Sequence, residues 1–516
     1  MTTTRFKSFP NLYKDSVALM QIGVQLRERA GVAQASCVMA TPANLAQLLD
    51  ADLQVDVQAS PSDLLVVVRG DPDACTEAIA AADALLHAKG AARDGESTAF
   101  SLPLTSLALG VEQAPDADLA LISVPGDYAA AEAMKALALG LHVMLFSDNV
   151  PIEEERAVKE VARAKGLLVM GPDCGTAIVN GVPLGFANVV RRGTIGLVAA
   201  SGTGLQEVTC RIHNLGGGIS QAIGTGGRDL KEAVGGITML QGLAALAADA
   251  QTRVIVLVSK PPAPPIARRI EEAASASGKP VVVHFLGAAD QLAQVGLHVA
   301  TSLRHAADVA VALAAGKPVP AALHEAMASD RAAIARLAGQ MASTQRTVCG
   351  LFTGGTFCYE TQLAFIARGL ACRSNAPAGG AGVFEGRFDG HVFLDLGDDD
   401  YTRGRPHPMI DPSLRDAMVR ARGTDAHVAA ILFDVVLGYG AHPDPADGLA
   451  SALADAQATA RAQGRALALI GHVCGTDGDP QHKAAQVKKL EAAGALIAGS
   501  NIEAAMLAAE LASSRT

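Results

Sequence analysis

The sequence predicts an α/β protein with several Rossmann-like or flavodoxin-like parallel-sheet domains and a small α+β domain at the N-terminus. Three observations favour this fold. Short apolar runs alternate with helical patterns along most of the chain, which is typical of helices that connect parallel strands. Half of the residues are hydrophobic but only 3% are aromatic, a composition that suits close packing of helices on parallel sheets. With 516 residues, the chain has the length of about three or four domains.

Four domains are expected along the chain. Residues 1–105 have strands and helices in the spacing of a ferredoxin-like or ACT-like α+β domain. Residues 106–190 alternate strand and helix, as a doubly wound parallel sheet does. The same alternation recurs in residues 191–325, and again in residues 326–516 after a helical connector.

Each strand predicted in residues 106–190 ends in a turn rich in proline, glycine or polar residues. Ligands of open parallel sheets bind at the carboxyl ends of the strands. These turns therefore supply three candidates for cofactor binding, which are Pro125, Asn149 and Cys174. The last of these turns is alternatively a loop that only ends a strand. Cys174 fits a buried thiol better than a nucleophile, because no histidine lies near it in the sequence.

Two stretches of the chain share one layout. Leu197–Glu207 reads LVAASGTGLQE and Gly350–Glu360 reads GLFTGGTFCYE. Each has an apolar run, a turn of small residues and a Gly-Thr pair, with a glutamate four residues after the threonine and a helical pattern beyond. Matching strands follow in matching order; they are expected at 194–199, 220–223, 253–258 and 280–285, and at 347–351, 390–394, 429–433 and 465–470. We interpret this as a duplication, the alternative being that unrelated α/β units look alike.

The two turns are candidate anion sites. A strand that turns through glycine into a helix directs backbone N–H groups outward at the positive end of the helix dipole, which favours phosphate or carboxylate. The candidate binding residues are Ser201, Gly202, Thr203, Gly355 and Thr356. The alternative is an ordinary tight turn whose hydroxyl caps the helix. If the copies are related, two helix N-termini are expected to face one anionic intermediate.

Three further loops carry candidate residues. Gly226, Gly227 and Arg228 follow a predicted strand, where glycine permits close approach and arginine offers a charge; the alternative is a flexible loop with a solvated arginine. The acidic stretch 395–400 suits a cation or a solvated turn, and we favour the turn and predict no metal site. Arg405 and His407 stand beside two prolines in a stiff loop, and His442 precedes a helix together with Asp444; proline and aspartate at a helix start are also structural signals.

Composition excludes several classes of function. The net charge is −10 and no basic block is visible, so nucleic-acid binding is not expected. The eight cysteines show no metal-ligand spacing and are read as reduced thiols. No signal-like or membrane-spanning apolar run is present. The sequence therefore predicts a cytoplasmic protein without a membrane partner.

Several motifs resemble known families. Val169–Gly175, Gly193–Thr203 and Ile223–Gly227 resemble, in order and spacing, the α-subunit of succinyl-CoA synthetase. That resemblance covers about residues 118–315 and, more weakly, 345–510. Gly397–Pro412 and Gly438–Pro445 are similar to the FdrA family of bacterial acyl-CoA-synthetase-like proteins, a similarity that covers nearly the whole chain. The resemblance implies domains of succinyl-CoA synthetase type: a CoA-binding-like domain at 106–190, and two ligase-CoA-type domains at 191–325 and 326–516.

The synthetase resemblance also implies a mechanism. In that family a histidine carries a phosphoryl group between two helix N-termini, one from each ligase-type domain. His298 stands at the family's offset from the strand that begins at Lys279, although Leu297 interrupts the family's Gly-His pair. Lys260 stands near the position of the glutamate that orients this histidine. The catalytic candidates are His298, Lys260, His407 and His442, and Arg228, Lys260 and Arg405 are expected to neutralise anionic charge.

Two features of the synthetases are missing from this sequence. Residues 1–117 contain no glycine-rich loop of the kind that grips CoA, and no stretch suggests a nucleotide-binding domain. No cofactor is therefore assigned, and CoA remains open. The chain is expected to work with other subunits, as an oligomer, on small anions such as phosphate, oxalurate or another acyl donor.

The FdrA resemblance implies a specific reaction. Members of that family resemble subunits of oxamate carbamoyltransferase, which converts oxalurate and phosphate to oxamate and carbamoyl phosphate in allantoin degradation. We therefore expect an enzyme, a carbamoyltransferase that acts within a complex. One alternative is an acyl-CoA ligase that needs a nucleotide-binding partner. A further alternative is a non-catalytic scaffold that binds a metabolite.

Overall fold

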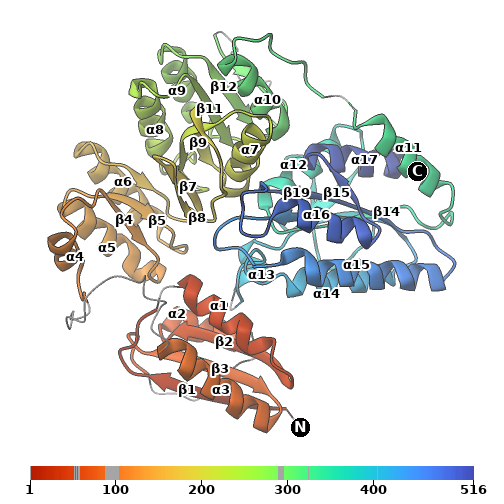
Figure 1. Cartoon of the computed structure of the whole chain (residues 1–516), viewed down its shortest axis with the longest axis horizontal. Coiled ribbons are helices and arrows are strands. Elements are labelled where there is room, and N and C mark those ends of the chain that lie inside the picture. Colours follow the sequence, from red (N-terminus) through yellow and green to blue (C-terminus); the bar gives the residue numbers. More distant parts are fainter. Residues whose placement is uncertain are drawn as a thin grey trace. The chain divides into compact units, whose positions relative to one another are not determined.

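The computed structural model describes residues 2–14, 16–51, 53, 55, 59–87, 104–288, 296–323, 325–403 and 405–515. The chain divides into two compact units, one of Met1–Val169 with Thr402–Pro406 and one of Met170–Tyr401 with His407–Thr516. Large parallel sheets with connecting helices and a small antiparallel N-terminal sheet confirm the predicted fold class (Figure 1). Among the described residues, no helix combines the length and apolar character that a bilayer span requires.

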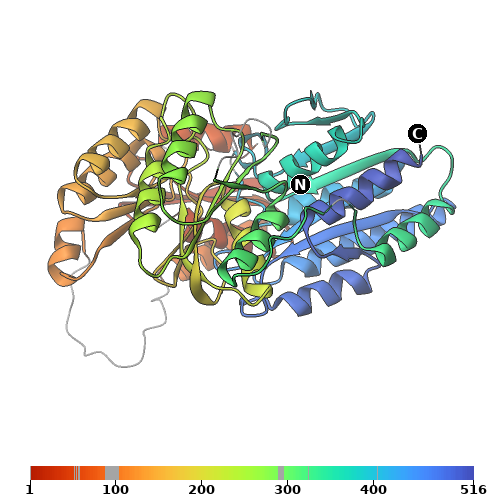
Figure 2. The same ribbon diagram turned by 90° about the horizontal axis from the view of Figure 1, so that it is seen from above.

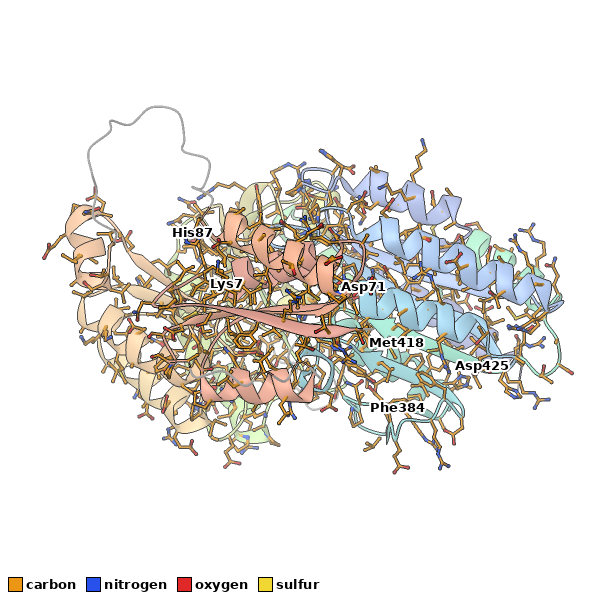
Figure 3. The ribbon with its side chains drawn as sticks, turned by 90° about the horizontal axis from the view of Figure 1, so that it is seen from below. Lys7, Asp71, His87, Phe384, Met418 and Asp425 are labelled. Atoms are coloured by element: carbon orange, nitrogen blue, oxygen red, sulfur yellow. The ribbon has the colours of Figure 1, made fainter. Side chains whose placement is uncertain are left out.

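An antiparallel sheet forms the N-terminal part of the first unit. The central strand β3 pairs with β1 on one side and β2 on the other, and its apolar run is fully buried. Lys7 of β1 forms an ion pair with Asp83 of α3 (3.1 Å), near His87 at the end of that helix (Figure 3). The elements are β1 (Thr3–Phe9), α1 (Ser16–Arg27), β2 (Val32–Met39), α2 (Pro42–Asp50), β3 (Leu64–Gly70) and α3 (Pro72–His87).

A second small sheet follows, with the strand order β4-β5-β6. Strands β4 and β5 run parallel, and α5 packs on both because its alanines form one buried face. The elements are α4 (Leu107–Gln113), β4 (Leu119–Ile122), α5 (Gly126–Ala138), β5 (His142–Leu145), α6 (Ile152–Ala164) and β6 (Val169–Met170).

The second unit contains two seven-stranded sheets, which we call the first and second lobes. The first lobe has the order β13-β12-β11-β9-β10-β7-β8. Strands β9 to β13 pair in parallel, whereas β7 pairs antiparallel with β8 and β10. Its elements are β7 (Thr176–Val179), β8 (Val182–Gly185), β9 (Arg192–Ala200), α7 (Gly202–Asn214), β10 (Ile219–Gly224), α8 (Ile237–Ala248), β11 (Val254–Ser259), α9 (Pro264–Ser275), β12 (Val281–Phe285), β13 (His298–Val299) and α10 (Leu303–Ala314).

The second lobe has the order β16-β15-β17-β14-β18-β19-β20, and all its pairs are parallel. Strand β18 is buried along its whole length because helices cover both faces of the sheet (Figure 2). The elements are α11 (Ala328–Ala338), β14 (Thr347–Phe352), α12 (Gly355–Ile366), β15 (Cys372–Ser374), β16 (Gly382–Val383), β17 (His391–Asp395), α13 (Asp399–Thr402), α14 (Ser413–Gly423), β18 (Val428–Val436), α15 (Pro445–Ala462), β19 (Ala468–Cys474), α16 (Lys483–Ala492), β20 (Leu496–Ala498) and α17 (Asn501–Ser513).

The two lobes repeat one topology. Strands β9 and β14 are each the middle strand of their sheet, and each leads into a helix at the shared motif. Outward from them, β11, β12 and β13 of the first lobe correspond to β18, β19 and β20 of the second. The first lobe adds the antiparallel pair β7 and β8, and the second adds β15 and β16. None of these four short strands was expected from the sequence.

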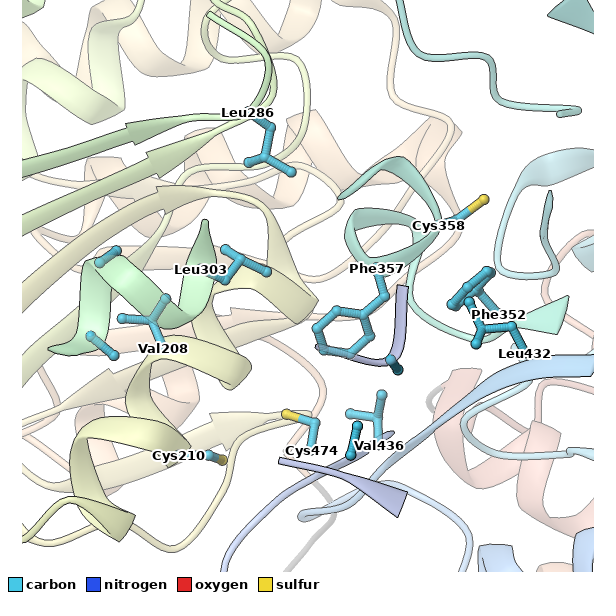
Figure 4. Close-up of a cluster of buried hydrophobic side chains, with 14 of the residues drawn as sticks. Val208, Cys210, Leu286, Leu303, Phe352, Phe357, Cys358, Leu432, Val436 and Cys474 are labelled. Carbon is cyan, nitrogen blue, oxygen red and sulfur yellow. The ribbon is translucent and has the colours of Figure 1, made fainter. Parts of the chain in front are cut away.

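A common apolar core joins the lobes. Helix α7 packs against α10 of its own lobe and against α12 of the other, and α12 also packs against α17. Val208 and Leu303 from the first lobe and Phe357 and Cys474 from the second belong to one buried cluster (Figure 4). This shared core holds the N-termini of α7 and α12 in a fixed relation to each other.

Candidate functional site

The N-termini of α7 and α12 meet where the lobes join. Ser201 caps α7, and its hydroxyl accepts a hydrogen bond from the Gly204 N–H (3.0 Å). The same hydroxyl lies 2.5 Å from the hydroxyl of Thr356 in the first turn of α12. A Cβ added at Gly354 would lie 2.9 Å from Cγ2 of Thr203. We call Ser201–Thr203 and Gly354–Thr356 the helix-tip pair.

The helix-tip pair joins the N-terminal ends of two helices. The positive ends of two helix dipoles converge there, and each contributes about half an elementary charge. Two hydroxyls and the unpaired first-turn N–H groups of two helices offer hydrogen bonds to an anion. The arrangement therefore favours a phosphoryl or carboxylate group beside two chain segments that are distant in the sequence.

A buried carboxylate caps the α12 turn. Asp434, near the end of β18, accepts hydrogen bonds from the Thr353 N–H (2.7 Å), the Thr353 hydroxyl (2.8 Å) and the Gly354 N–H (2.8 Å). Burial raises its pKa, and these bonds together with Arg415 act in the opposite direction. Because Asp434 takes the first two N–H groups of the turn, an anion would meet α12 at Gly355 and Thr356.

Asp395 and Lys260 flank the same turn. Asp395 ends β17 so close to Gly355 that a Cβ added there would lie 2.2 Å from its Oδ2. Burial raises the pKa of Asp395 to about 6, against the lowering effect of Lys260. Lys260 follows β11 of the first lobe. Its ammonium group lies 5.5 Å from the ring centre of Tyr359 on α12. The structure thus brings a lysine from one lobe to the N-terminal part of α12 in the other.

The glycine loop after β10 lies against the turn after β6. Gly226 has φ +81°, and a Cβ there would lie 2.1 Å from the Pro172 carbonyl oxygen, so a side chain cannot be accommodated. A Cβ at Gly227 would lie 3.8 Å from Oδ2 of Asp173. Cys174 is buried, and its thiol donates to the Thr176 carbonyl (3.5 Å). Arg228 belongs to the same loop, where its carbonyl accepts from the Lys231 N–H.

His407 lies on the Asp395 side of the helix-tip pair. A Cβ added at Gly397 would lie 2.6 Å from Nε2 of His407 and 3.3 Å from Oδ1 of Asp395. Burial lowers the pKa of His407 to about 4, and its Nδ1 accepts from the Met409 N–H (3.2 Å). A neutral ring with the proton on Nε2 follows from this geometry. His442 is tied to the same loop, because its N–H donates to the Met409 carbonyl.

Other predicted residues lie elsewhere. His298 is in β13, opposite Val282 and separated from β9 by two strands, so the structure does not place it at the helix-tip pair. Arg405 is grouped with the other unit, as are Pro125 and Asn149. Pro125 caps α5, and Asn149 has φ 54° after β5. In the described part of the chain, no group of three acidic, histidine or cysteine side chains has an arrangement suited to a metal ion.

A buried ion pair that the sequence interpretation missed joins the lobes behind the helix tips. Glu207 of α7 lies 2.8 Å from Nε2 of His472 in β19. Nδ1 of His472 faces the Ala498 carbonyl (3.2 Å), so both ring nitrogens face oxygen atoms. Burial raises the pKa of Glu207, but His472, Lys483 and Arg211 outweigh it and the net shift is downward. The ring of His472 packs edge-on against Phe357, next to Thr356.

The corresponding residues of the other lobe are arranged differently. Glu360 of α12 accepts from the Leu303 N–H (3.1 Å) and from Asn501 Nδ2 (2.8 Å), and burial raises its pKa to about 7. His284 corresponds to His472, faces the Ala300 carbonyl (2.9 Å) and has a pKa lowered by burial to about 4. Both glutamates belong to the repeated motif, and each histidine interrupts an apolar strand. A histidine within an apolar strand was the sequence signal that could have identified these residues.

Models of three domain families match the chain. A CoA-ligase domain matches residues 351–511, a CoA-binding domain matches residues 191–287, and the AllF heavy-metal-associated domain matches residues 1–101. The assignment of residues 106–190 to a CoA-binding-like domain stays a prediction. The matched families define a protein built from succinyl-CoA synthetase-like domains, preceded by an AllF-type N-terminal domain.

The similarity to one relative extends along the whole chain. YahF of Escherichia coli (strain K12), an uncharacterized protein, is 42% identical over 507 residues, which are 97% of each chain. The chain belongs to the same family as YahF, within the succinyl-CoA synthetase-like group. The α-subunit 2 of the ADP-forming succinate–CoA ligase of Archaeoglobus fulgidus is 28% identical over 33% of this chain and 60% of its own length.

The chain has a weak structural similarity to one solved acetyl-coenzyme A synthetase. The dinucleotide-forming acetyl-coenzyme A synthetase 1 of Ca. Korarchaeum cryptofilum matches 77% of this chain and 83% of its own at 17% identity. The TM-score is 0.32, so this likeness does not bear on function.

Proposed function

We propose that the chain is a subunit of a transferase that forms an acyl or carbamoyl phosphate, and that the helix-tip pair holds the transferred group. The contact between Ser201 and Thr356 carries the proposal, because it joins two helix N-termini at one point. Transfer between a carboxylate-bearing donor and phosphate requires two anions to approach each other. Converging dipoles, hydroxyls and a nearby lysine offset that repulsion.

The specific reaction proposed is that of oxamate carbamoyltransferase. Oxalurate and phosphate would give oxamate and carbamoyl phosphate: a phosphate oxygen attacks the carbamoyl carbon, and the bond from that carbon to the oxamate nitrogen breaks. The nitrogen gains a proton as oxamate leaves. The FdrA resemblance and the AllF-type match at residues 1–101 support this choice.

Lys260 and the helix-tip pair have separate roles in this proposal. Lys260, which is near the Tyr359 ring and acts electrostatically on Asp395, would neutralise phosphate as it enters. Ser201 and Thr356 would hold the oxyanion that forms at the carbamoyl carbon. The leaving nitrogen would take the proton that the attacking phosphate releases, and His407, with its Nε2 proton close to Asp395, would donate a hydrogen bond to that nitrogen.

A second candidate function is acyl-CoA ligation with a nucleotide-binding partner. The matches to CoA-ligase and CoA-binding domains and to the α-subunits of ADP-forming ligases favour it. That reaction would use the same helix-tip pair for a phosphoryl group. It would also require CoA and ATP, which carbamoyl transfer does not.

The test uses the full chain purified together with its co-expressed partner subunits. Oxalurate and phosphate are supplied without CoA or nucleotide, and carbamoyl phosphate is measured. The proposal expects its formation, and expects at least a hundredfold loss when the chain carries both Ser201→Ala and Thr356→Val. ADP release that depends on CoA and a carboxylic acid, without carbamoyl phosphate, would establish the ligase function in its place. No turnover in either assay would favour the remaining alternative, a non-catalytic scaffold that binds a metabolite.

A further inference from the structure

A polar cavity lies between the lobes, away from the helix-tip pair. It measures about 290 Å³. Its lining includes Glu207 and Arg211 of α7, Leu215 at the end of that helix, and His472, Lys483 and Gly499 of the second lobe. The α7 residues are spaced by four along the sequence and so share one face of that helix. The helix-tip pair lies at the start of α7, whereas this cavity borders its later turns.

The size of the cavity limits its ligand. Pockets for drug-sized ligands and cofactors usually measure about 300–1,000 Å³, and this one is at the lower limit. At about 30 Å³ for each water molecule in the liquid, the space equals roughly ten waters. An organic acid of a few heavy atoms fits together with some water, but a nucleotide or CoA does not.

The charges around the cavity are paired with one exception. Arg211 donates two hydrogen bonds to Asp308 (2.7 and 3.2 Å), and His472 is paired with Glu207. Lys483, the first residue of α16, is half-buried, and its ammonium has no ion-pair partner among the residues that the structure describes. An unpaired ammonium on the wall of a polar cavity is suited to a carboxylate.

The cavity also offers an acceptor. Glu207 uses Oε2 for His472, and within the described residues its other oxygen has no hydrogen-bond donor. Lys483 and Arg211 act electrostatically on this carboxylate, which places their charges within reach of it. A ligand with only an anionic group would meet repulsion from Glu207. A ligand that also donates a hydrogen bond would satisfy both walls of the cavity.

We propose that this cavity binds a small organic carboxylate that also carries an N–H or O–H donor, with Lys483 pairing with its carboxylate and Glu207 accepting its hydrogen. Binding would join α7 of the first lobe to α16 of the second. The proposal does not depend on the transfer reaction, and it concerns a separate site from the helix-tip pair.

Oxamate and pyruvate test the proposal as a matched pair of probes. They share an α-oxo carboxylate and differ in an amide NH₂ against a methyl group. Calorimetric titration of the full chain, in buffer without phosphate, is expected to give at least tenfold tighter binding for oxamate. Lys483→Met is expected to weaken the binding of oxamate at least tenfold and to leave the melting temperature unchanged. Lys488→Met, an exposed lysine on the same helix, is the control and should bind oxamate as the unmodified chain does.

Thr356→Val separates this site from the helix-tip pair, and the proposal expects it to leave cavity binding unchanged. Oxamate binding lost in Thr356→Val but intact in Lys483→Met would overturn the proposal while supporting an anion site at the helix tips. Equal affinity for oxamate and pyruvate would also overturn it, and so would no binding of either. Binding of inorganic phosphate that depends on Lys483, without binding of oxamate, would show an ion site and overturn the assignment to an organic acid.

Discussion

The hydroxyls of Ser201 and Thr356 lie 2.5 Å apart although 155 positions separate them in the sequence. Each lies at the N-terminal end of the helix that follows the middle strand of its lobe. A duplicated strand–turn–helix unit brings the same end of each copy to one point only if the lobes face each other. The shared core around α7 and α12 holds them that way.

Removing one hydroxyl from this contact should weaken anion binding. Thr356→Val keeps the shape of the side chain but removes the hydrogen bond to the Ser201 hydroxyl, which keeps only its bond from the Gly204 N–H. We expect about a tenfold loss of phosphate affinity, the equivalent of about 1.4 kcal/mol for one hydrogen bond. Calorimetric titration with phosphate measures this affinity. Thr459→Val is the control, because that hydroxyl bonds only the Asp455 carbonyl in its own helix, and its affinity should equal that of the unmodified chain.

The first residues of the two helices should respond differently to a methyl group. In Gly355→Ala the new Cβ would lie 2.2 Å from Asp395, whereas in Gly202→Ala the nearest heavy atom is Thr176 Oγ1 at 3.7 Å. Overpacking typically costs about 1–3 kcal/mol, so Gly355→Ala should lower the free energy of unfolding by that amount. Gly202→Ala should leave it within about 0.5 kcal/mol. Equal effects of both substitutions in urea unfolding would show that Asp395 does not press on the α12 turn.

Asp395 should make stability depend on pH. Its pKa is raised from 3.8 to about 6 by burial, so between these values the folded state keeps a proton that the unfolded state has released. Stability from this group therefore falls as pH rises through that window, by up to about 1.4 kcal/mol per pH unit. In Asp395→Asn the side chain does not titrate, so the variant does not lose stability in this way as the pH rises. The stability of the variant relative to the unmodified chain should rise by about 2 kcal/mol between pH 4 and pH 6.5, and then level off. A difference that stays constant with pH would contradict the assignment.

The buried Glu207–His472 pair should couple the lobes energetically. Removing one partner of a buried ion pair typically costs about 3–5 kcal/mol, because the other charge is left uncompensated. Glu207→Gln and His472→Gln should each cost that much, and the double variant should cost clearly less than the sum. Urea unfolding of the four proteins gives the coupling energy.

An exposed ion pair provides the comparison for that cycle. Arg420 and Asp455 lie 2.8 Å apart on the surface of the second lobe, where such pairs contribute about 0–1 kcal/mol. The cycle of Arg420→Gln and Asp455→Asn should show coupling in that range. Similar coupling energies in both cycles would mean that Glu207 and His472 do not hold the lobes together.

Only the locally encoded parts of the candidate site could be predicted from the sequence. Ser201 and Thr356 stand in a strand–turn–helix pattern that a short window of sequence reveals, and the repetition of the pattern indicated two lobes. Glu207 and His472 form one pair across 265 positions, and no local pattern predicts such a pair. The interrupted apolar strand around His472 was visible, but its partner depends on how the lobes pack.

The less successful inferences have a common physical reason. His298 was selected by its offset from Lys279, but an offset along the chain does not determine which sheet position a residue takes, and His298 lies in an edge strand. Arg405 was selected because it stands in a stiff loop beside His407, yet the two residues belong to different units. The short strands β7, β8, β15 and β16 hold so few residues that periodicity could not reveal them.

A crystal structure of the full chain grown with saturating selenate tests the central claim most directly, because anomalous scattering from selenium locates the anion without ambiguity. We predict one selenate that contacts both the Ser201 hydroxyl and the first turn of α12 at Thr356. Selenate bound elsewhere, with both helix ends empty, would contradict the claim that α7 and α12 together form an anion site.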